Sequence, residues 1–347
     1  MKKIKLFIVD DSATVRQTIS KLIENENDIE LLGVAADPLF AIKKFQTTGL
    51  PDVLILDIEM PRMDGITFLK QIMQENPIST IICSSCAKSG SLKAIEALQS
   101  GAVDIIEKPD LQTKAFLEKS KNILLSSIRS AALVRVKKVS NTSIKSNPKK
   151  DIQPLSTTIN NKKIIAIGSS TGGVQVIEKI LTSLKETVVP ILITQHMPAG
   201  FTASLAKRLN NLSKLTIKQA EHGDKLVDST VYIAPGNKHM TLKKEHTNFI
   251  INITDGPKVS HHRPSVDVLF RSVANSIGKN GIGIILTGMG NDGSHGMKEM
   301  FDVGAKTYAQ DEQSCVVYGM PNEAKKLGGV CHSLSIEKII EYIQSIR

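Results

Sequence analysis

Lys5-Leu6-Phe7-Ile8-Val9-Asp10-Asp11-Ser12 is a short apolar run that ends in two acidic residues and a serine. The apolar part has the length and composition of a buried strand. Ser12 is of a type that caps helices, so we expect a helix to follow as far as about Glu24. Strands of nearly continuous Val, Ile and Leu are typical of parallel sheets covered by helices on both faces. This stretch therefore predicts an α/β fold in which acidic side chains follow a strand.

The same pattern, an apolar strand followed by a turn, returns four more times in the first third of the chain. We expect strands at residues 31–35, 53–56, 80–83 and 104–107, and a helix at about residues 38–47. The last three strands are followed in turn by Asp57, Ser84 and Lys108. Sites in parallel sheets form at the carboxyl ends of strands, so we expect these side chains to converge with Asp10 and Asp11.

The converging side chains predict phosphoryl chemistry. Close carboxylates repel one another unless a cation joins them, and hard oxygen ligands in a small acidic site suit Mg²⁺. Asp57 would then attack a phosphoryl group to form an aspartyl phosphate. Lys108 would supply positive charge, and Ser84 a hydroxyl donor, to the phosphoryl oxygens. The alternative is that these are solvated loop residues, and five matched positions count against it.

Three motifs resemble the response-regulator receiver family, over about residues 3–125. They are Phe7-Ile8-Val9-Asp10-Asp11-Ser12, Leu56-Asp57-Ile58-Glu59-Met60-Pro61-Arg62-Met63-Asp64-Gly65 and Glu107-Lys108-Pro109. The resemblance implies a flavodoxin-like receiver with a five-stranded parallel sheet, Asp57 as the phosphoacceptor, and Ser84 and Lys108 as switch residues. The metal-site residues that it implies are Asp10, Asp11, Asp57 and Glu59, the last through its backbone carbonyl. The family has an aromatic residue three positions before the lysine, where this chain has Ile105.

A second decisive stretch lies beyond the middle of the chain. A buried-type strand at residues 164–167 leads into Gly168-Ser169-Ser170-Thr171-Gly172-Gly173, and we expect a helix to begin near Val174. Glycines let a backbone approach a ligand closely, and a helix start offers unpaired N–H groups. A serine in such a turn can attack a carbonyl while the N–H groups stabilise the oxyanion. The turn could instead cradle a phosphate, although it has neither a G-x-G-x-x-G pattern nor a P-loop lysine.

A histidine and an aspartate follow two further predicted strands. His196 comes after the strand at residues 189–194, and Asp292 lies in a glycine-rich loop after the strand at residues 281–286. With a serine they would supply a nucleophile, a base and an orienting carboxylate at one edge of a Rossmann-like, doubly wound, mostly parallel α/β domain. The competing residues are His239 and His262 for the base, and Asp224 and Asp267 for the carboxylate.

The whole chain resembles the CheB family of chemotaxis protein-glutamate methylesterases, which carry an N-terminal receiver. The motifs that match in order are Gly168-Ser169-Ser170-Thr171-Gly172-Gly173, Thr194-Gln195-His196-Met197-Pro198, Ile233-Ala234-Pro235-Gly236, His262-Arg263-Pro264-Ser265-Val266-Asp267, Leu286-Thr287-Gly288-Met289-Gly290-Asn291-Asp292-Gly293 and Tyr318-Gly319-Met320-Pro321. The resemblance implies Ser170, rather than Ser169, as the nucleophile, His196 as the general base and Asp292 as the carboxylate that orients it. The implied oxyanion donors are backbone N–H groups near Thr171 and Met289.

The reaction that the resemblance implies is hydrolysis of glutamate γ-methyl esters on chemoreceptors during chemotaxis adaptation. Methanol is released, and certain receptor glutamines are deamidated as a second activity. The implied partners are methyl-accepting chemotaxis receptors as substrate and the histidine kinase CheA as phosphodonor. The resemblance also implies that ester hydrolysis needs no cofactor and that Mg²⁺ serves the receiver. In the family, the receiver covers the catalytic face until it is phosphorylated. The alternatives are a receiver-gated serine esterase for another protein or small ester, and a non-catalytic response regulator.

Length and charge bound the domain organisation. A chain of 347 residues exceeds what one core usually serves, so we expect a receiver at residues 1–130, a flexible basic linker at 131–162 and a catalytic domain at 163–347. Most of the net charge of +10 lies in residues 131–163, which hold eight basic side chains and one acidic side chain. We interpret this segment as a solvated tether and expect no nucleic-acid partner.

Cysteine content and hydropathy indicate the cellular compartment in which we expect the protein. The four cysteines are too few for a disulfide framework, and we interpret Cys83 and Cys86, which form a C-x-x-C, as small apolar residues in a reducing compartment. No apolar stretch approaches the roughly 18 residues of a membrane span. The N-terminus lacks the pattern of a secretory signal. We therefore expect a cytoplasmic protein without membrane insertion.

Overall fold

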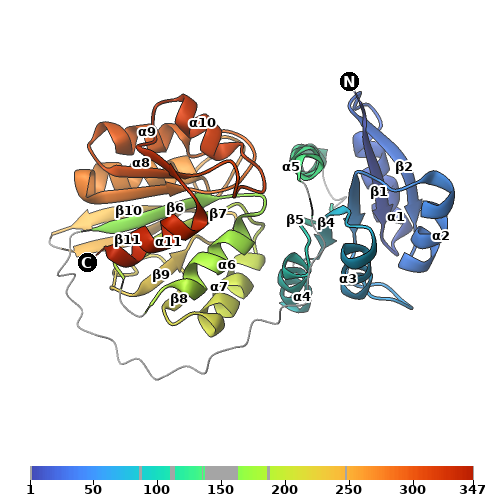
Figure 1. Cartoon of the computed structure of the whole chain (residues 1–347), viewed down its shortest axis with the longest axis horizontal. Helices are drawn as coiled ribbons and strands as arrows, with labels where there is room; N and C mark the ends of the chain where they lie inside the picture. The colour runs from blue at the N-terminus through green and yellow to red at the C-terminus, as the bar shows by residue number, and fades with distance from the viewer. Residues whose placement is uncertain are drawn as a thin grey trace. The chain divides into compact units, whose positions relative to one another are not determined.

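Two parallel sheets, one in each of two structural units, organise the chain (Figure 1). The computed structural model describes residues 2–85, 88–109, 114–134, 136, 163–185, 188–246 and 248–346. The units comprise residues 1–143 and 144–347. The last helix of the first unit runs to Leu133, past the predicted boundary at residue 130. Residues 137–162 of the predicted linker lie outside the described residues.

The first unit contains the predicted five-stranded parallel sheet, and its strand order is β2-β1-β3-β4-β5. Its elements are β1 (Ile4–Val9), α1 (Ala13–Ile23), β2 (Ile29–Ala35), α2 (Pro38–Thr48), β3 (Val53–Leu56), α3 (Gly65–Glu75), β4 (Ser79–Ser84), α4 (Lys88–Gln99), β5 (Asp104–Glu107) and α5 (Lys114–Leu133). The largest difference from the predicted strands is that β2 begins at Ile29 rather than at residue 31. As an edge strand it tolerates the exposed Glu30, which hides its apolar pattern.

Alternation along β1 shows that helices cover both faces of this sheet. Leu6 and Ile8 lie in an apolar cluster with side chains of α1 and α5. Phe7 points to the opposite face, where its ring meets that of Phe45 on α2 at a centroid distance of 4.8 Å. Because both faces are covered, the strands are apolar throughout, and polar residues are left to their ends.

The second unit contains a seven-stranded sheet with the strand order β14-β13-β12-β6-β7-β9-β8. Every pairing in it is parallel, so the expectation of a mostly parallel sheet is met in full, and the antiparallel hairpin of β10 and β11 forms a separate sheet. The strands are β6 (Ile164–Ser169), β7 (Ile191–Gln195), β8 (Thr216–Gln219), β9 (Thr230–Ile233), β10 (His239–Glu245), β11 (Asn248–Thr254), β12 (Gly281–Ile285), β13 (Lys306–Gln310) and β14 (His332–Leu334). The helices are α6 (Gly173–Ser183), α7 (Phe201–Leu212), α8 (Val266–Ile277), the short 3₁₀ helix η1 (Gly278–Asn280), α9 (Ser294–Asp302), α10 (Met320–Lys326) and α11 (Ile336–Ser345).

The strand order reverses at β6. On one side of β6 the chain adds β7, then β8 at the edge and then β9 between β7 and β8, and later it adds β12, β13 and β14 on the other side. Loops that leave neighbouring strands at such a reversal open a crevice at the carboxyl ends of the strands. Ser170 follows β6, and Asp292 and His196 follow the two strands beside β6, which are β12 and β7.

Two further expectations concern the cysteines of the C-x-x-C pair and the absence of a membrane span. Cys83 is fully buried in β4, and burial raises the pKa of its thiol, which fits an inert core residue. Cys86 lies outside the described residues. In the part of the chain that the structure describes, no helix has the length and apolar character needed to cross a bilayer.

Candidate functional sites

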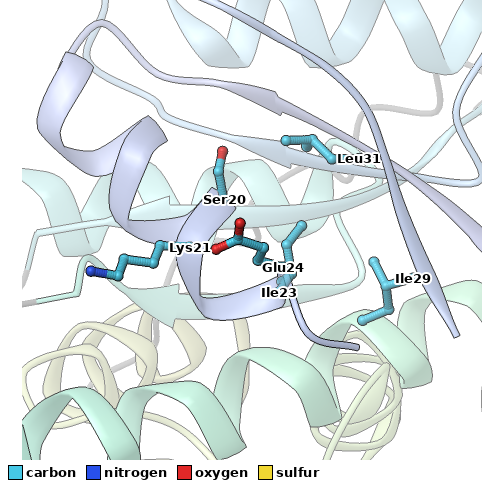
Figure 2. Close-up of a pocket in the computed structure, with 6 residues that line it drawn as sticks. All are labelled: Ser20, Lys21, Ile23, Glu24, Ile29 and Leu31. Carbon is cyan, nitrogen blue, oxygen red and sulfur yellow. The ribbon is translucent and has the colours of Figure 1, made fainter. Parts of the chain in front are cut away.

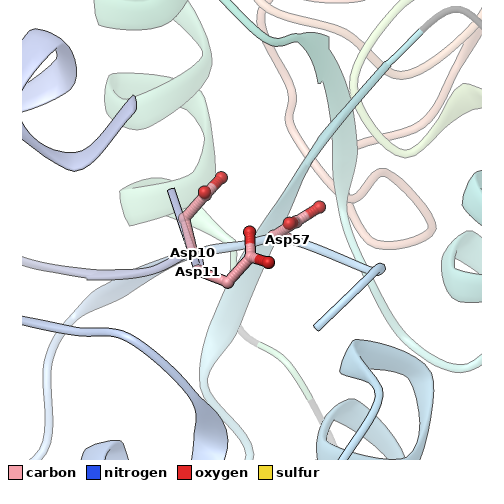
Figure 3. A group of neighbouring side chains, drawn as sticks. All are labelled: Asp10, Asp11 and Asp57. Carbon is pink, nitrogen blue, oxygen red and sulfur yellow. The ribbon is translucent and has the colours of Figure 1, made fainter. Parts of the chain in front are cut away.

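Three carboxylates meet where β1 and β3 end (Figure 3). One oxygen from each of Asp10, Asp11 and Asp57 lies within 4.8 Å of the others. Asp10 and Asp57 are buried and Asp11 is exposed. Lys108, which follows β5, brings its Nζ to 2.7 Å from Asp57 Oδ2 and 3.1 Å from Asp10 Oδ2. Four of the predicted residues therefore come together at one edge of the sheet.

The electrostatics of this cluster favour a bound cation. Burial raises the pKa of both Asp10 and Asp57, although Lys108 opposes the rise. Burial acts to lower the pKa of Lys108, but the hydrogen bond and charge of Asp57, with the charge of Asp10, outweigh it and raise that pKa. Asp10 Oδ2 is buried and forms no hydrogen bond of good geometry with any described residue. The three carboxylates supply hard oxygen ligands, and Asp10 Oδ2 is a buried oxygen that is left without a well-formed hydrogen bond. This combination fits Mg²⁺.

The other predicted residues of the first unit lie at the rim of the cluster. The Glu59 side chain is exposed and pairs with Lys93 at 3.1 Å. This leaves the backbone carbonyl of Glu59 for the metal-binding role that the receiver resemblance implied. Ser84 ends β4, and its carbonyl accepts a hydrogen bond from the Lys108 N–H at 3.1 Å. Its hydroxyl donates to the Ser85 carbonyl at 3.4 Å rather than to Asp57. Ile105 is buried.

A hollow elsewhere in the first unit is not connected with these residues. Its volume is about 470 Å³, and it is lined by Ser20, Lys21, Ile23, Glu24, Ile29 and Leu31 (Figure 2). It lies where α1 ends and β2 begins, at the opposite end of the sheet from Asp10 and Asp57. Half of its six lining residues are aliphatic and the others are a serine, a lysine and a glutamate, so it offers no chemistry related to the acidic cluster.

In the second unit His196 and Asp292 are joined directly. His196 Nε2 lies 2.7 Å from Asp292 Oδ2, and the exposed fractions of the two side chains are only 7% and 1%. The Asp292 carboxylate also accepts hydrogen bonds at the start of α8, from the Ser265 hydroxyl (2.7 Å), the Val266 N–H (2.8 Å) and the Asp267 N–H (3.1 Å). The unpaired N–H groups and the dipole of a helix start stabilise negative charge.

These contacts keep Asp292 ionised despite its burial. Burial alone would raise its pKa, but the hydrogen bond and charge of His196, with the bonds from Ser265 and Val266, lower the pKa to about 2. Sequence reasoning placed Asp292 in this role but missed the supporting Ser265. The available signal was a serine directly before an apolar run of helical period, which is an N-cap pattern.

Ser170 lies at the turn between β6 and α6 and is half-buried. Its N–H donates to the Thr287 carbonyl at 3.0 Å, and its own carbonyl accepts from the Gly173 N–H at 2.8 Å. Gly172 has a φ of +75°, which favours glycine, so the turn needs this residue. Among the described residues, His196 Nδ1 is buried without a hydrogen-bond partner, and no hydrogen bond joins it to the Ser170 hydroxyl. Catalytic hydrogen bonds of this kind are often looser without substrate.

The competing residues have other contacts. His262 stacks on His196 with ring centroids 3.7 Å apart and planes at 5°, and burial together with the charge of His196 lowers the pKa of His262 to about 3. His239 bonds the Pro257 carbonyl through Nε2 (2.8 Å) and the Ser265 N–H through Nδ1 (3.3 Å). Asp267 accepts from the Gly296 N–H (2.7 Å), and Asp224 from Lys218 Nζ (2.9 Å).

Two backbone N–H groups near Ser170 are available to a ligand. In the part of the chain that the structure describes, neither the Thr171 N–H nor the Met289 N–H has a hydrogen-bond partner. Gly288, which precedes Met289, approaches the turn that holds Ser170 so closely that a Cβ on Gly288 would lie 2.7 Å from the Ser170 Cβ. The loop after β12 is therefore packed directly against the serine.

Comparison with known proteins identifies the family. The family model described as CheB methylesterase matches residues 165–343, and the one described as response regulator receiver domain matches residues 6–118. The chain belongs to the CheB methylesterase family. The resemblance seen in the sequence is thereby confirmed.

Relatives match this family member over nearly its whole length. A protein-glutamate methylesterase/protein-glutamine glutaminase of Shewanella oneidensis is 49% identical and covers 98% of each chain. One of Leptospira interrogans is 50% identical over 98% of this chain and 99% of its own. The crystal structure of the Thermotoga maritima CheB methylesterase catalytic domain matches with a TM-score of 0.51 and 39% identity, covering 52% of this chain and 97% of that domain.

Proposed function

We propose that this chain hydrolyses glutamate γ-methyl esters on chemoreceptors, with release of methanol, and deamidates specific receptor glutamines. The observation that carries the proposal is the His196–Asp292 hydrogen bond of 2.7 Å beside a serine turn, with His196 Nδ1 left without a partner in the described chain. The shared identity with proteins named protein-glutamate methylesterase/protein-glutamine glutaminase supports the substrate class.

The mechanism follows from the tautomer of His196. The ionised Asp292 accepts the Nε2–H, so Nδ1 carries the lone pair and takes the proton of the Ser170 hydroxyl. Ser170 Oγ attacks the ester carbonyl, and the Thr171 and Met289 N–H groups bind the oxyanion. The intermediate collapses to an acyl-serine, and His196 returns the proton to the departing methanol. Water then attacks with the same base and releases glutamate, while an amide substrate loses ammonia instead.

We infer that the first unit is a phosphorylation switch for this reaction. Asp57 is the proposed phosphoacceptor, and Ser84 and Lys108 the proposed switch residues. Asp10, Asp11, Asp57 and the Glu59 carbonyl would hold Mg²⁺, which supplies positive charge that neutralises the phosphoryl oxygens. The proposed phosphodonor is the histidine kinase CheA. Methyl-accepting chemotaxis receptors present their methylated helices in the cytoplasm, where we place the protein.

A Ser170→Ala variant tests the catalytic assignment through methanol release from a methyl-esterified receptor. We expect release to fall to background, because the nucleophile is lost. Ser183→Ala is the matched control, since the Ser183 hydroxyl only bonds the Lys179 carbonyl within α6. Release retained by Ser170→Ala would contradict the triad. If the wild type itself releases no methanol, a different ester substrate or a non-catalytic regulator is favoured.

A further inference from the structure

Gln195, the last residue of β7, links the proposed nucleophile to the proposed base. Its Nε2 donates to the carbonyl oxygens of Ser170 (2.9 Å) and His196 (3.0 Å), and its Oε1 accepts from the Ser169 hydroxyl (2.6 Å). Gln195 and Ser169 are both buried. Both amide hydrogens are used, and a reversed amide would set Oε1 against two carbonyl oxygens. The side chain is therefore held in one orientation.

The hydrogen bond to the Ser170 carbonyl also fixes the direction of the Thr171 N–H. These two groups belong to one planar trans peptide unit and point in opposite directions. A donor that holds the Ser170 oxygen thereby aims the Thr171 N–H away from Gln195. The Thr171 N–H has no partner among the described residues and is one of the two proposed oxyanion donors.

The second proposed donor is built in the same way from the backbone alone. The Gly288 carbonyl accepts hydrogen bonds from the N–H groups of Gly319 (3.1 Å) and Met320 (2.8 Å) at the start of α10. This fixes the peptide unit that carries the Met289 N–H. The Met289 donor is thus aimed by main-chain groups alone, whereas the Thr171 donor is aimed by the Gly173 N–H (2.8 Å to the Ser170 carbonyl) together with the Gln195 side chain. The Thr171 donor is therefore the one that mutation of a side chain can address.

The turn needs such a support because it is rich in glycine. Gly172 and Gly173 follow Thr171, and glycine leaves a backbone free to adopt several conformations. A Cβ on Gly173 would lie 2.4 Å from Gln195 Oε1, so the turn packs directly against the amide. Donors that are aimed before the substrate arrives need no reorganisation during the reaction.

We propose that Gln195, oriented by Ser169, is a positioning residue that aims the Thr171 N–H at the oxyanion. This inference deepens the proposed function and rests on it. It also gives Ser169 a role distinct from that of its neighbour Ser170, since its hydroxyl orients the amide instead of attacking the ester.

The test uses the full chain and compares Gln195→Leu and Ser169→Ala with Gln219→Leu. Gln219 is a matched control because it also ends a strand of the same sheet and accepts a hydroxyl hydrogen bond, from Thr202 at 2.7 Å. We expect Gln195→Leu to lower kcat for methanol release about 100-fold, since the loss of one oxyanion donor costs about 100- to 1,000-fold. Ser169→Ala should lower kcat less, about tenfold, because it removes only the hydrogen bond that orients the amide. KM and the pH dependence of kcat/KM should not move, because the His196–Asp292 bond is untouched. The control should keep kcat.

The outcomes separate the positioning role from a general loss of structure. Near-ultraviolet circular dichroism of the tyrosines gives the folded fraction, to which kcat is referred. If the folded Gln195→Leu and Ser169→Ala proteins keep the wild-type kcat, or if their KM or pH profile shifts as much as kcat, the proposal is overturned. If Gln195→Leu does not fold, Ser169→Ala decides, since it removes a single oxygen. Ser170→Ala in the same assay tests the proposed function independently: if it is inactive while Gln195→Leu is fully active, only the positioning role fails.

Discussion

Asp292 illustrates how the fold sets the charge of one side chain. A carboxylate with 1% exposure would ordinarily favour its neutral form, yet three donors at the start of α8 and the His196 ring keep it ionised. An ionised Asp292 holds the Nε2–H tautomer of His196 and leaves the lone pair on Nδ1, the proposed base. The charge state of Asp292 thus decides which nitrogen of His196 is free for the proposed proton transfer.

We expect Asp292→Asn to destabilise the second unit at neutral pH, by on the order of 2 kcal/mol. The pKa of Asp292 is depressed to about 2, so its stabilising effect is complete above the unfolded value of 3.8 and is lost as pH falls toward 2. The free-energy difference between variant and wild type should therefore shrink across this window. Urea unfolding monitored by the circular dichroism of the tyrosines measures this free-energy difference in the second unit. All four tyrosines lie in that unit: Tyr232, Tyr308, Tyr318 and Tyr342.

The control for this measurement is Asp302→Asn, which changes an exposed aspartate paired with Lys298 near the end of α9. It should behave like the wild type at every pH. A destabilisation by Asp292→Asn that stays constant down to pH 3 would contradict the electrostatic explanation and point to lost packing instead.

His262 is expected to act through its ring. With a pKa lowered to about 3, it is neutral at physiological pH and places an uncharged face on His196. We expect His262→Ala to lower kcat/KM about fivefold, since a stacked ring pair is worth about 1 kcal/mol, and His262→Phe to restore most of it. Methanol release measured across pH checks this. Equal losses in the two variants would show that an imidazole nitrogen, rather than the stack, is what matters.

At the scale of elements, α8 and α9 cap each other. Asp292, in the loop before α9, accepts N–H groups at the start of α8, while Asp267 in the first turn of α8 accepts the Gly296 N–H of α9 at 2.7 Å. The N-cap of α9 is Gly293, which has no side chain to cap with. The proposed catalytic carboxylate is therefore one half of a reciprocal cap that ties two packed helices together.

Removing the other half of this cap should destabilise the second unit. We expect Asp267→Ala to cost about 1–2 kcal/mol, because the buried N–H of Gly296 loses its acceptor. Asp267→Asn should cost less, since the amide oxygen still accepts and burial already raises the pKa of Asp267 beside Asp292. Urea unfolding followed through the tyrosines gives both values. An Asn variant as unstable as the Ala variant would show that the charge, and not the acceptor, is needed.

The strand ends could be predicted from the sequence because they obey a local rule. A buried parallel strand is largely apolar, so the polar residues that end it or follow it mark the functional edge, as for Asp10, Asp57 and His196. Gln195 also lies at this edge, as the last residue of β7, but neither its role nor that of Ser265 follows from the rule. Their roles depend on hydrogen bonds to Asp292 and Ser170, which are distant in sequence and meet them only when the sheet assembles. The strand order and the wholly parallel pairing of the second sheet are tertiary properties for the same reason.

At the scale of the whole molecule, one architectural rule is used for two chemistries. Each unit places its reactive side chains at the carboxyl ends of parallel strands, but the first gathers carboxylates around a lysine, and the second joins a histidine to a single carboxylate. The first arrangement suits a phosphoryl group and a cation, and the second suits acyl transfer. The proposed switch requires the chemical state of Asp57 to alter the proposed activity of Ser170, which is an equilibrium shift between less and more active states.

We therefore expect a small phosphodonor such as acetyl phosphate, with Mg²⁺, to raise methanol release by the full chain about fivefold or more, the lower end of typical couplings between sites. Asp57→Asn should abolish this stimulation while leaving basal release intact, because the amide cannot accept the phosphoryl group. Asp52→Asn is the matched control: Asp52 precedes the strand that Asp57 follows, and it accepts the Lys5 N–H at 2.9 Å at the opposite end of the sheet. Chelation of Mg²⁺ should remove the stimulation of the wild type. Equal stimulation of Asp57→Asn and wild type would refute control through Asp57, whereas loss of stimulation in Asp52→Asn as well would show that the receiver responds to any damage to its sheet.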